Sequence, residues 1–216
     1  MVIVSDGEDE ALKAFIAGCA NQKIRLLISD GQGKKHAIAQ GVAAAVNDWV
    51  LVTDSDCLPS SLRYFDTMAA SLKNSKTQIV LGYAPLRVKG SFISRLAGYE
   101  ASYIAMQYLS YALAGMPYMG VGRNMLFDRA LYLKNRQNLF DNGLVSGDDD
   151  MFVQAAANAE NTAICFHPYT HCVSDAPESL TTWFRQRQRQ NTTASFYRLR
   201  HIILLGASAA LHAGVS

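Results

Sequence analysis

The chain has 216 residues, of which 50% are hydrophobic and 18% are charged. This composition suffices for a substantial buried core in one domain and excludes an intrinsically disordered chain. The net charge of +2 excludes a general attraction to nucleic acid, although arginines cluster between Arg185 and Arg200. Four cysteines occur without a CxxC pair or a preceding secretory signal. We therefore expect reduced thiols in a cytosolic setting rather than a disulfide framework.

The first half of the chain alternates strand-like and helix-like patterns. Apolar runs predict strands over residues 1–4 and 24–29, and helical spacing of apolar residues predicts a helix over residues 8–21. A turn containing two glycines then carries Lys34 and Lys35 and leads into another helix. This alternation predicts βαβ units and a mostly parallel sheet.

A third strand, over residues 49–52, is followed closely by Asp54 and Asp56. Two carboxylates at positions i and i+2 of an extended segment point the same way. Such a pair suits a hard divalent cation that also holds a diphosphate. The alternative is an ordinary strand-to-turn junction, because Asp and Ser are common turn residues.

The α/β alternation continues with a helix expected over residues 59–73 and a strand over residues 78–83. A long segment rich in tyrosine follows over residues 91–119. We expect it to form a helix that lies across the sheet edge or against a membrane surface. Its tyrosines suit either internal packing or a half-wet surface that accepts sugars or lipid head groups.

Two later segments carry further candidate residues. A loop with Gly122, Arg123 and Asn124 precedes another apolar run, and its glycines let the backbone approach a ligand closely. Three consecutive carboxylates, beginning at Asp148, start a helix expected to reach residue 158. They either cap that helix or raise one another's pKa, as a general base working near neutral pH requires.

The last part of the chain contains a strand expected over residues 162–166 and a helix from about residue 177. The histidines and cysteine of residues 167–172 lack a second pair at zinc-ligand spacing, so we do not expect zinc. Arg185 and Arg189 stand one helical turn apart in the final helix. Guanidinium groups prefer bidentate contacts with phosphate, but a solvated basic face or an anionic-lipid contact is the alternative.

Read in order, these segments resemble the inverting family 2 glycosyltransferases of the GT-A fold, the group that includes cellulose and hyaluronan synthases. The resemblance covers residues 2–205. It implies that Asp6 contacts the nucleotide base or ribose and that Lys34, with Lys35, lies near the nucleotide. It also implies that Asp54 and Asp56 form the DxD motif that holds the metal and the donor diphosphate.

The remaining motifs resemble the acceptor side and the catalytic base of the same family. Gly122, Arg123 and Asn124 resemble the acceptor-binding loop. Asp148 corresponds to the catalytic base, with Asp149 as the candidate if the register shifts by one residue. Residues 186–190 resemble the Gln-x-x-Arg-Trp motif, which assigns Gln186 and Arg189 to the donor and leaves Gln190 in place of tryptophan.

The resemblance implies an α/β fold of the GT-A type, a Rossmann-like mostly parallel sheet with flanking helices plus C-terminal amphipathic helices. The implied activity is inverting transfer of a sugar from a nucleotide-diphosphate donor, a UDP-sugar, with Mg²⁺ or Mn²⁺. The implied acceptor is a saccharide or a lipid-linked molecule, and nucleic acid is not an expected partner.

The expected domain covers residues 1–197, and residues 198–216 form an apolar helix. Because fewer than about 20 residues follow His201, we expect an interfacial or truncated membrane helix. It would place the protein peripherally on the cytoplasmic face of the inner or plasma membrane.

The main departure from the family is that its first β/α unit has no counterpart ahead of Met1. A missing strand would leave the backbone N–H and C=O groups of the neighbouring strand without hydrogen-bond partners. The alternative function is therefore a catalytically inactive remnant that binds nucleotide or an anionic membrane surface.

Overall fold

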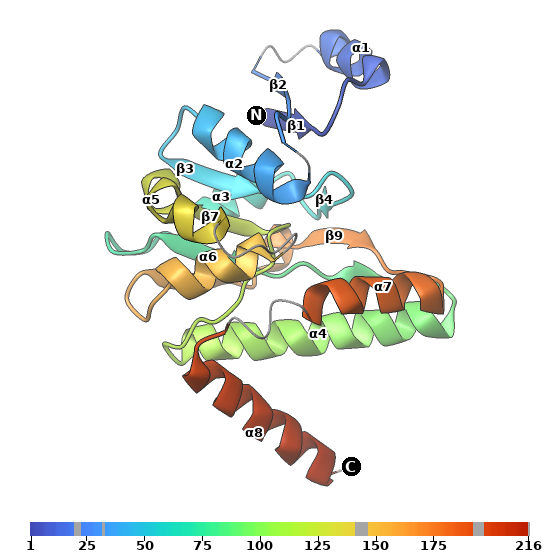
Figure 1. Ribbon diagram of the computed structural model, residues 1–216, viewed down its shortest axis with the longest axis vertical. Coiled ribbons are helices and arrows are strands. Elements are labelled where there is room, and N and C mark those ends of the chain that lie inside the picture. Colours follow the sequence, from blue (N-terminus) through green and yellow to red (C-terminus); the bar gives the residue numbers. More distant parts are fainter. Residues whose placement is uncertain (20–22, 32, 141–146, 192–196, 216) are drawn as a thin grey trace.

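The computed structural model describes residues 1–216 except 20–22, 32, 141–146, 192–196 and 216. Its central sheet has the strand order β3-β7-β5-β8 (Figure 1). These strands are β3 (Trp49–Val52), β5 (Ile79–Gly82), β7 (Met125–Asp128) and β8 (Thr162–Cys165). β5 and β8 are parallel, whereas β7 is antiparallel to both of its neighbours.

The α/β class is confirmed, but the sheet is mixed rather than mostly parallel. The reason is the connection between β5 and β7. It passes through β6 (Leu86–Arg87) and the 22-residue helix α4 (Phe92–Leu113), and then enters β7 beside the end of β5. There the Gly82 N–H donates to the Asn124 carbonyl at 3.0 Å. When a chain leaves a sheet and re-enters it at the same end, the second strand must run antiparallel to the first.

Side chains of the central sheet alternate between two buried cores, as the pleat of a strand requires. Ile79 and Leu81 face a larger core whose fully buried side chains also come from α4 and three other helices. These are α2 (Lys34–Ala44), α5 (Arg129–Phe140) and α6 (Asp148–Ala156). Val80 faces a smaller core with Met68 from α3 (Tyr64–Ala69). The sheet is thus covered on both faces.

The amino-terminal part of the chain forms a separate parallel pair, β1 (Val2–Ser5) with β2 (Arg25–Ile28), joined by α1 (Glu10–Gly18). Within the described residues, β1 and β3 are not hydrogen-bonded to each other. Figure 1 shows this unit at one end of the molecule, beside α2.

A third small sheet corrects one expected boundary. Its strands are β4 (Leu58–Pro59), β9 (Cys172–Asp175) and β6, and β9 follows the short 3-10 helix η1 (Pro168–Thr170). Because Leu58 and Pro59 pair with β9, the helix expected from residue 59 begins only at Tyr64, as α3.

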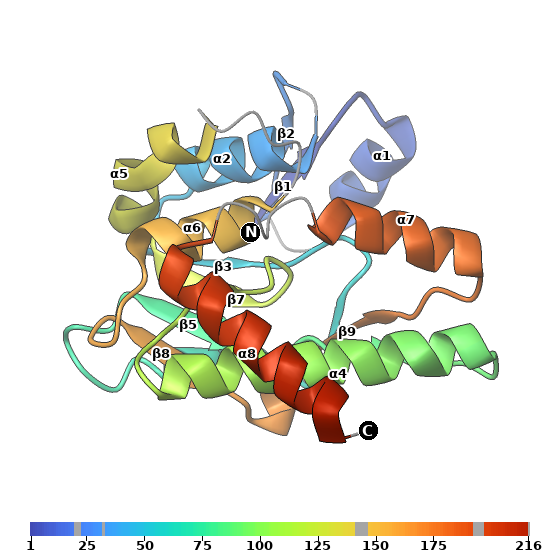
Figure 2. The same cartoon turned by 60° about the horizontal axis from the view of Figure 1, so that its bottom comes forward.

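The carboxyl-terminal part contains α7 (Leu180–Asn191), which lies along α4, and α8 (Leu199–Val215) (Figures 1 and 2). Among the described residues, no helix combines the length and apolar character that crossing a bilayer requires. The amphipathic character expected of this region stays a prediction, because the side chains of residues 208–216 lie outside the described part.

Asn124 joins the elements beneath the site. Its side chain has no exposed surface, and its Oδ1 accepts from the Tyr64 hydroxyl at 2.9 Å. Its Nδ2 donates to the carbonyls of Tyr83 and Thr170, both at 2.7 Å. A Cβ on Gly82 would lie within 2.6 Å of the Asn124 amide, so only glycine permits this close approach. One amide therefore ties the start of β7 to β5, α3 and η1.

We predict that Asn124→Ala lowers the free energy of unfolding by about 3 kcal/mol, because it removes the three buried hydrogen bonds of this amide. Chemical denaturation measures the change. Asn135→Ala is the control, since the one described bond of its amide is to a carbonyl of its own helix and alanine favours helix. Equal stability of the Asn124→Ala protein and the wild type would contradict this role.

Candidate active site

Four charged side chains from three separate elements meet beyond the end of β3. Lys34 begins α2, Asp54 follows β3, and Asp148 and Asp149 begin α6. Lys34 Nζ lies 2.6 Å from Asp54 Oδ1, and the ammonium group also feels the charges of Asp148 and Asp149. The helices α2 and α6 each start directly after a glycine of positive φ, 89° at Gly33 and 87° at Gly147. These glycines allow the sharp entries that bring the charges together.

Asp148 has the environment of a general base. Asp148 is only 8% exposed. Burial, followed by the neighbouring charge of Asp149, raises the pKa of Asp148 to about 6, although Lys34 opposes the shift. A carboxylate with such a pKa is ionised at neutral pH and still basic enough to accept a proton.

Asp149 is held in a different way. Its Oδ2 accepts from the Gly122 N–H at 2.7 Å, and its Oδ1 accepts from the Asp150 N–H at 3.0 Å. A Cβ on Gly122 would lie 3.1 Å from Asp149 Oδ2, so the glycine permits this contact. Asp149 therefore fastens the loop of residues 120–124 to the start of α6, whereas Asp148 remains the better candidate for proton transfer.

The carboxylates of Asp54 and Asp56 suit a divalent cation. Possible ligand atoms of Asp54, Asp56 and Cys57 all lie within 4.8 Å of one another. A hydrogen bond with Cys172 and burial raise the pKa of the Cys57 thiol, so it stays protonated. This leaves two carboxylates on one tight turn, which the Cys57 N–H closes onto the Asp54 carbonyl at 3.1 Å. Carboxylate oxygens are the donors that Mg²⁺ and Mn²⁺ prefer.

The other expected site residues are distributed around this cluster. Asp6 is exposed after β1, and no contact described in the structure joins it to Lys34 or Asp54. Lys35 is 7% exposed, so Lys34 is the lysine that reaches the carboxylates. A side chain without exposed surface cannot touch an acceptor, so the direct contact expected of Asn124 is replaced by the anchoring role described above.

The helix α7 carries the two residues expected at the donor phosphates. Gln186 is half-buried, and the side chain of Arg189 lies outside the described part of the structure. Glu100 of α4 contacts Trp183 and Arg187 of this helix, which no motif in the sequence predicted. A signal was available, because Glu100 is the only acidic residue in the sequence of α4.

Arg123 lies on the same side of the molecule. Its Nη2 donates to the Ala84 carbonyl at 2.8 Å, and its positive charge lowers the pKa of Arg187. The pKa of Arg187 is lowered chiefly by burial, and Glu100 opposes the shift. Arg123 and Arg187 of α7 therefore lie close enough for their charges to interact.

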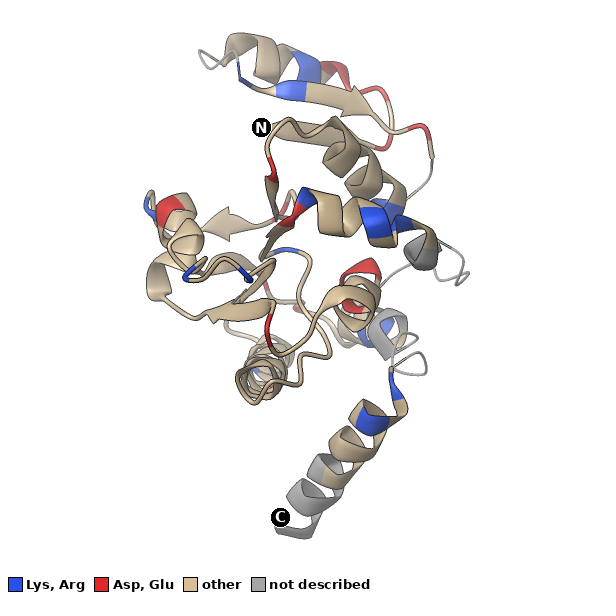
Figure 3. Ribbon diagram, turned by 90° about the vertical axis from the view of Figure 1, so that its left-hand side faces the viewer, with Lys and Arg blue, Asp and Glu red and all other residues tan. Residues whose placement is uncertain are grey.

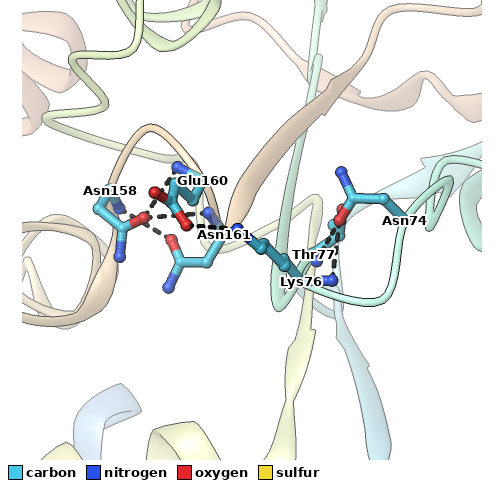
Figure 4. A network of polar contacts seen from close by, with 6 residues as sticks. All are labelled: Asn74, Lys76, Thr77, Asn158, Glu160 and Asn161. Carbon is cyan, nitrogen blue, oxygen red and sulfur yellow. Dashed lines mark hydrogen bonds and ion pairs between the residues drawn. The ribbon is translucent and has the colours of Figure 1, made fainter.

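A polar hollow of about 390 Å³ lies at the opposite end of the sheet, away from these charges. Its lining includes Trp49, Lys76 and Glu160. Figure 4 shows that the amides and charged groups here bond to one another across two turns, for example Lys76 to Glu160 at 2.9 Å. By contrast, the cavity that touches Asp148 and Asp149 measures only about 10 Å³. We place the site at the charged cluster, although the cavity there is small, because its carboxylates and its lysine could bind a metal and accept a proton.

The chain matches the model of the family described as glycosyltransferase like family 2 over residues 1–193, and it belongs to that family. No curated protein matches the chain by sequence.

Solved structures share the fold. The mannosyltransferase PcManGT from Pyrobaculum calidifontis, in complex with GDP-Man and Mn²⁺, matches with a TM-score of 0.60 and 16% identity, over 87% of this chain and 50% of that chain. Glucosyl-3-phosphoglycerate synthase from Mycobacterium tuberculosis, in complex with Mn²⁺, UDP and glucosyl-3-phosphoglycerate, matches with a TM-score of 0.53 and 14% identity, over 90% and 66%. The 4-diphosphocytidyl-2C-methyl-D-erythritolsynthase from Anaerococcus prevotii DSM 20548 gives a TM-score of 0.54 and 13% identity, over 84% and 74%.

These likenesses establish the GT-A glycosyltransferase fold that the sequence predicted. The chain spans half the length of the mannosyltransferase and 66% of the synthase.

We predict that Asp56→Asn weakens Mn²⁺ binding at least about tenfold, because it removes one of two charged ligands. Titration followed by the electron paramagnetic resonance of free Mn²⁺ measures the affinity. Asp66→Asn is the matched control, since Asp66 is an exposed aspartate of α3 outside the cluster. Equal Mn²⁺ affinity in all three proteins would contradict the metal site.

Proposed function

We propose that this domain transfers a sugar from a nucleoside-diphosphate donor to an acceptor hydroxyl, with inversion at the anomeric carbon and with Mg²⁺ or Mn²⁺. The observation that carries the proposal is the meeting of Asp148, whose pKa is about 6, with the Lys34–Asp54 ion pair. A base and a diphosphate-holding group on neighbouring strand and helix ends are what such a reaction needs. The GDP-Man and Mn²⁺ bound by the mannosyltransferase, and the UDP and Mn²⁺ bound by the synthase of the same fold, add support.

The reaction is a single displacement. The acceptor oxygen attacks the anomeric carbon, its proton passes to the Asp148 carboxylate, and the bond from the anomeric carbon to the diphosphate oxygen breaks. Attack from the side opposite the leaving group inverts the configuration. A divalent cation held by Asp54 and Asp56 would neutralise the charge that develops on the diphosphate. Lys34 and Arg189 add positive charge there.

Different elements of the fold contact the donor and the acceptor. Asp6 contacts the base or ribose of a UDP-sugar, Lys35 supports the turn at α2, and Gln186 lies on the donor side. Gly122 and Arg123 meet a saccharide or lipid-linked acceptor. The hydrogen bond from Gly122 to Asp149 supports this arrangement, because it holds the acceptor loop beside the base.

The segment of residues 198–216 binds peripherally to the cytoplasmic face of a membrane. Arg198 and Arg200 stand at its start, and the exposed fractions of Ile202 and Ile203 are 42% and 61%. Figure 3 shows basic residues at the beginning of α8 and no acidic residue in its described part. Basic charge followed by exposed apolar side chains favours an interfacial position on anionic lipid.

We predict that Asp148→Asn reduces sugar transfer by about 10³-fold and leaves Mn²⁺-dependent UDP binding unchanged, because it removes only the base. Transfer is assayed with UDP-sugars and binding by isothermal titration. Activity retained in Asp148→Asn and lost in Asp149→Asn would move the base by one residue. A wild-type protein that shows no Mn²⁺-dependent UDP binding would support the inactive remnant instead.

The pKa of Asp148 also predicts the pH dependence of kcat/KM. The base must be ionised, so kcat/KM should be constant above about pH 7 and fall about tenfold per unit below pH 6. A profile measured with constant saturating Mn²⁺ checks this. A descending limb centred near the ordinary pKa of an aspartate would exclude Asp148 as the titrating base.

A further inference from the structure

Glu100 is the one carboxylate in a helix that is rich in apolar and aromatic residues. α4 runs for 22 residues and contains one other charged residue, Arg95. The Glu100 side chain is only 30% exposed. A partly buried carboxylate in such surroundings needs partners, because burying an unpaired charge is costly.

Both described partners of Glu100 come from α7. Its Oε2 accepts from Trp183 Nε1 at 3.0 Å and lies 2.7 Å from Arg187 Nη2. Trp183 and Arg187 stand four residues apart, so they share one face of α7. One oxygen atom of α4 therefore fixes both the position of α7 along α4 and its rotation about its own axis.

Apolar packing contributes little to holding α7. Its large apolar residues Leu180 and Phe184 are 62% and 65% exposed. Arg187, by contrast, is 18% exposed at its side chain, and its charge-assisted contact with Glu100 is short. The polar anchor is thus the main described interaction that positions this helix.

We propose that Glu100 is a positioning residue for donor binding: by fixing α7 on α4, it holds the half-buried Gln186 on the donor side. This inference rests on the proposed function. Gln186 lies between Trp183 and Arg187 along α7, so the two contacts with Glu100 bracket it. A rotation of α7 that released Arg187 would turn Gln186 by the same angle. Figures 1 and 2 show α7 running roughly parallel to α4.

The test compares Glu100→Gln with the charge-swapped double variant Glu100→Arg, Arg187→Glu. Glu100→Gln should weaken UDP binding in the presence of Mn²⁺ about tenfold and reduce kcat by up to about 100-fold. Its affinity for Mn²⁺ alone should stay unchanged, because Asp54 and Asp56 lie on another element. The double variant should recover most of the UDP affinity. Glu178→Gln is the control, since it removes an exposed ion pair with Lys89 just before α7.

The emission of Trp183 reports the docking of α7 independently of activity. In a Trp49→Phe background Trp183 is the sole tryptophan, and Glu100→Gln should shift its emission. A shifted emission with unchanged UDP affinity would make Glu100 merely structural and overturn the positioning role. Unchanged emission would overturn the docking itself. If the wild type binds no UDP, the proposed function fails and the donor role of α7 fails with it.

Discussion

The site depends on one ion pair, that between Lys34 and Asp54 at 2.6 Å. It joins the start of α2 to the end of β3, and the same ammonium group offsets the charges of Asp148 and Asp149 on α6. Without this cation, the carboxylate of Asp54 and the two carboxylates of α6 would repel one another in a partly buried space. The glycines of positive φ before α2 and α6 let the backbone turn sharply enough to bring these charges together.

The charge balance explains why neighbouring aspartates differ. Burial and then the charge of Asp149 raise the pKa of Asp148, and one lysine among three carboxylates does not cancel that shift. The remaining negative charge suits a cation at Asp54 and Asp56. Asp149 receives two backbone N–H groups and is held as a fixed carboxylate. Different environments can thus give two adjacent aspartates different roles, one as a base and the other as a structural anion.

Local patterns in the sequence predicted much of this arrangement. The apolar run before Asp54, the acidic start of α6 and the lysines after Gly33 are each short-range signals, and each lies where it was expected. The burial of Asn124 and the antiparallel entry of β7 could not be read in the same way. They depend on contacts between distant segments, such as Asn124 with Thr170. Glu100 lies 83 residues from Trp183, and only its isolation in α4 hinted at a role.

The GT-A fold therefore supplies a frame, and the chemistry lies in a few charges at the ends of its elements. Titration of the Asp148 carboxyl by carbon-13 nuclear magnetic resonance, with Asp148→Asn used to assign its signal, tests the central claim most directly. The account predicts a midpoint at about pH 6. A midpoint near the ordinary value for aspartate, about 3.9, would contradict it.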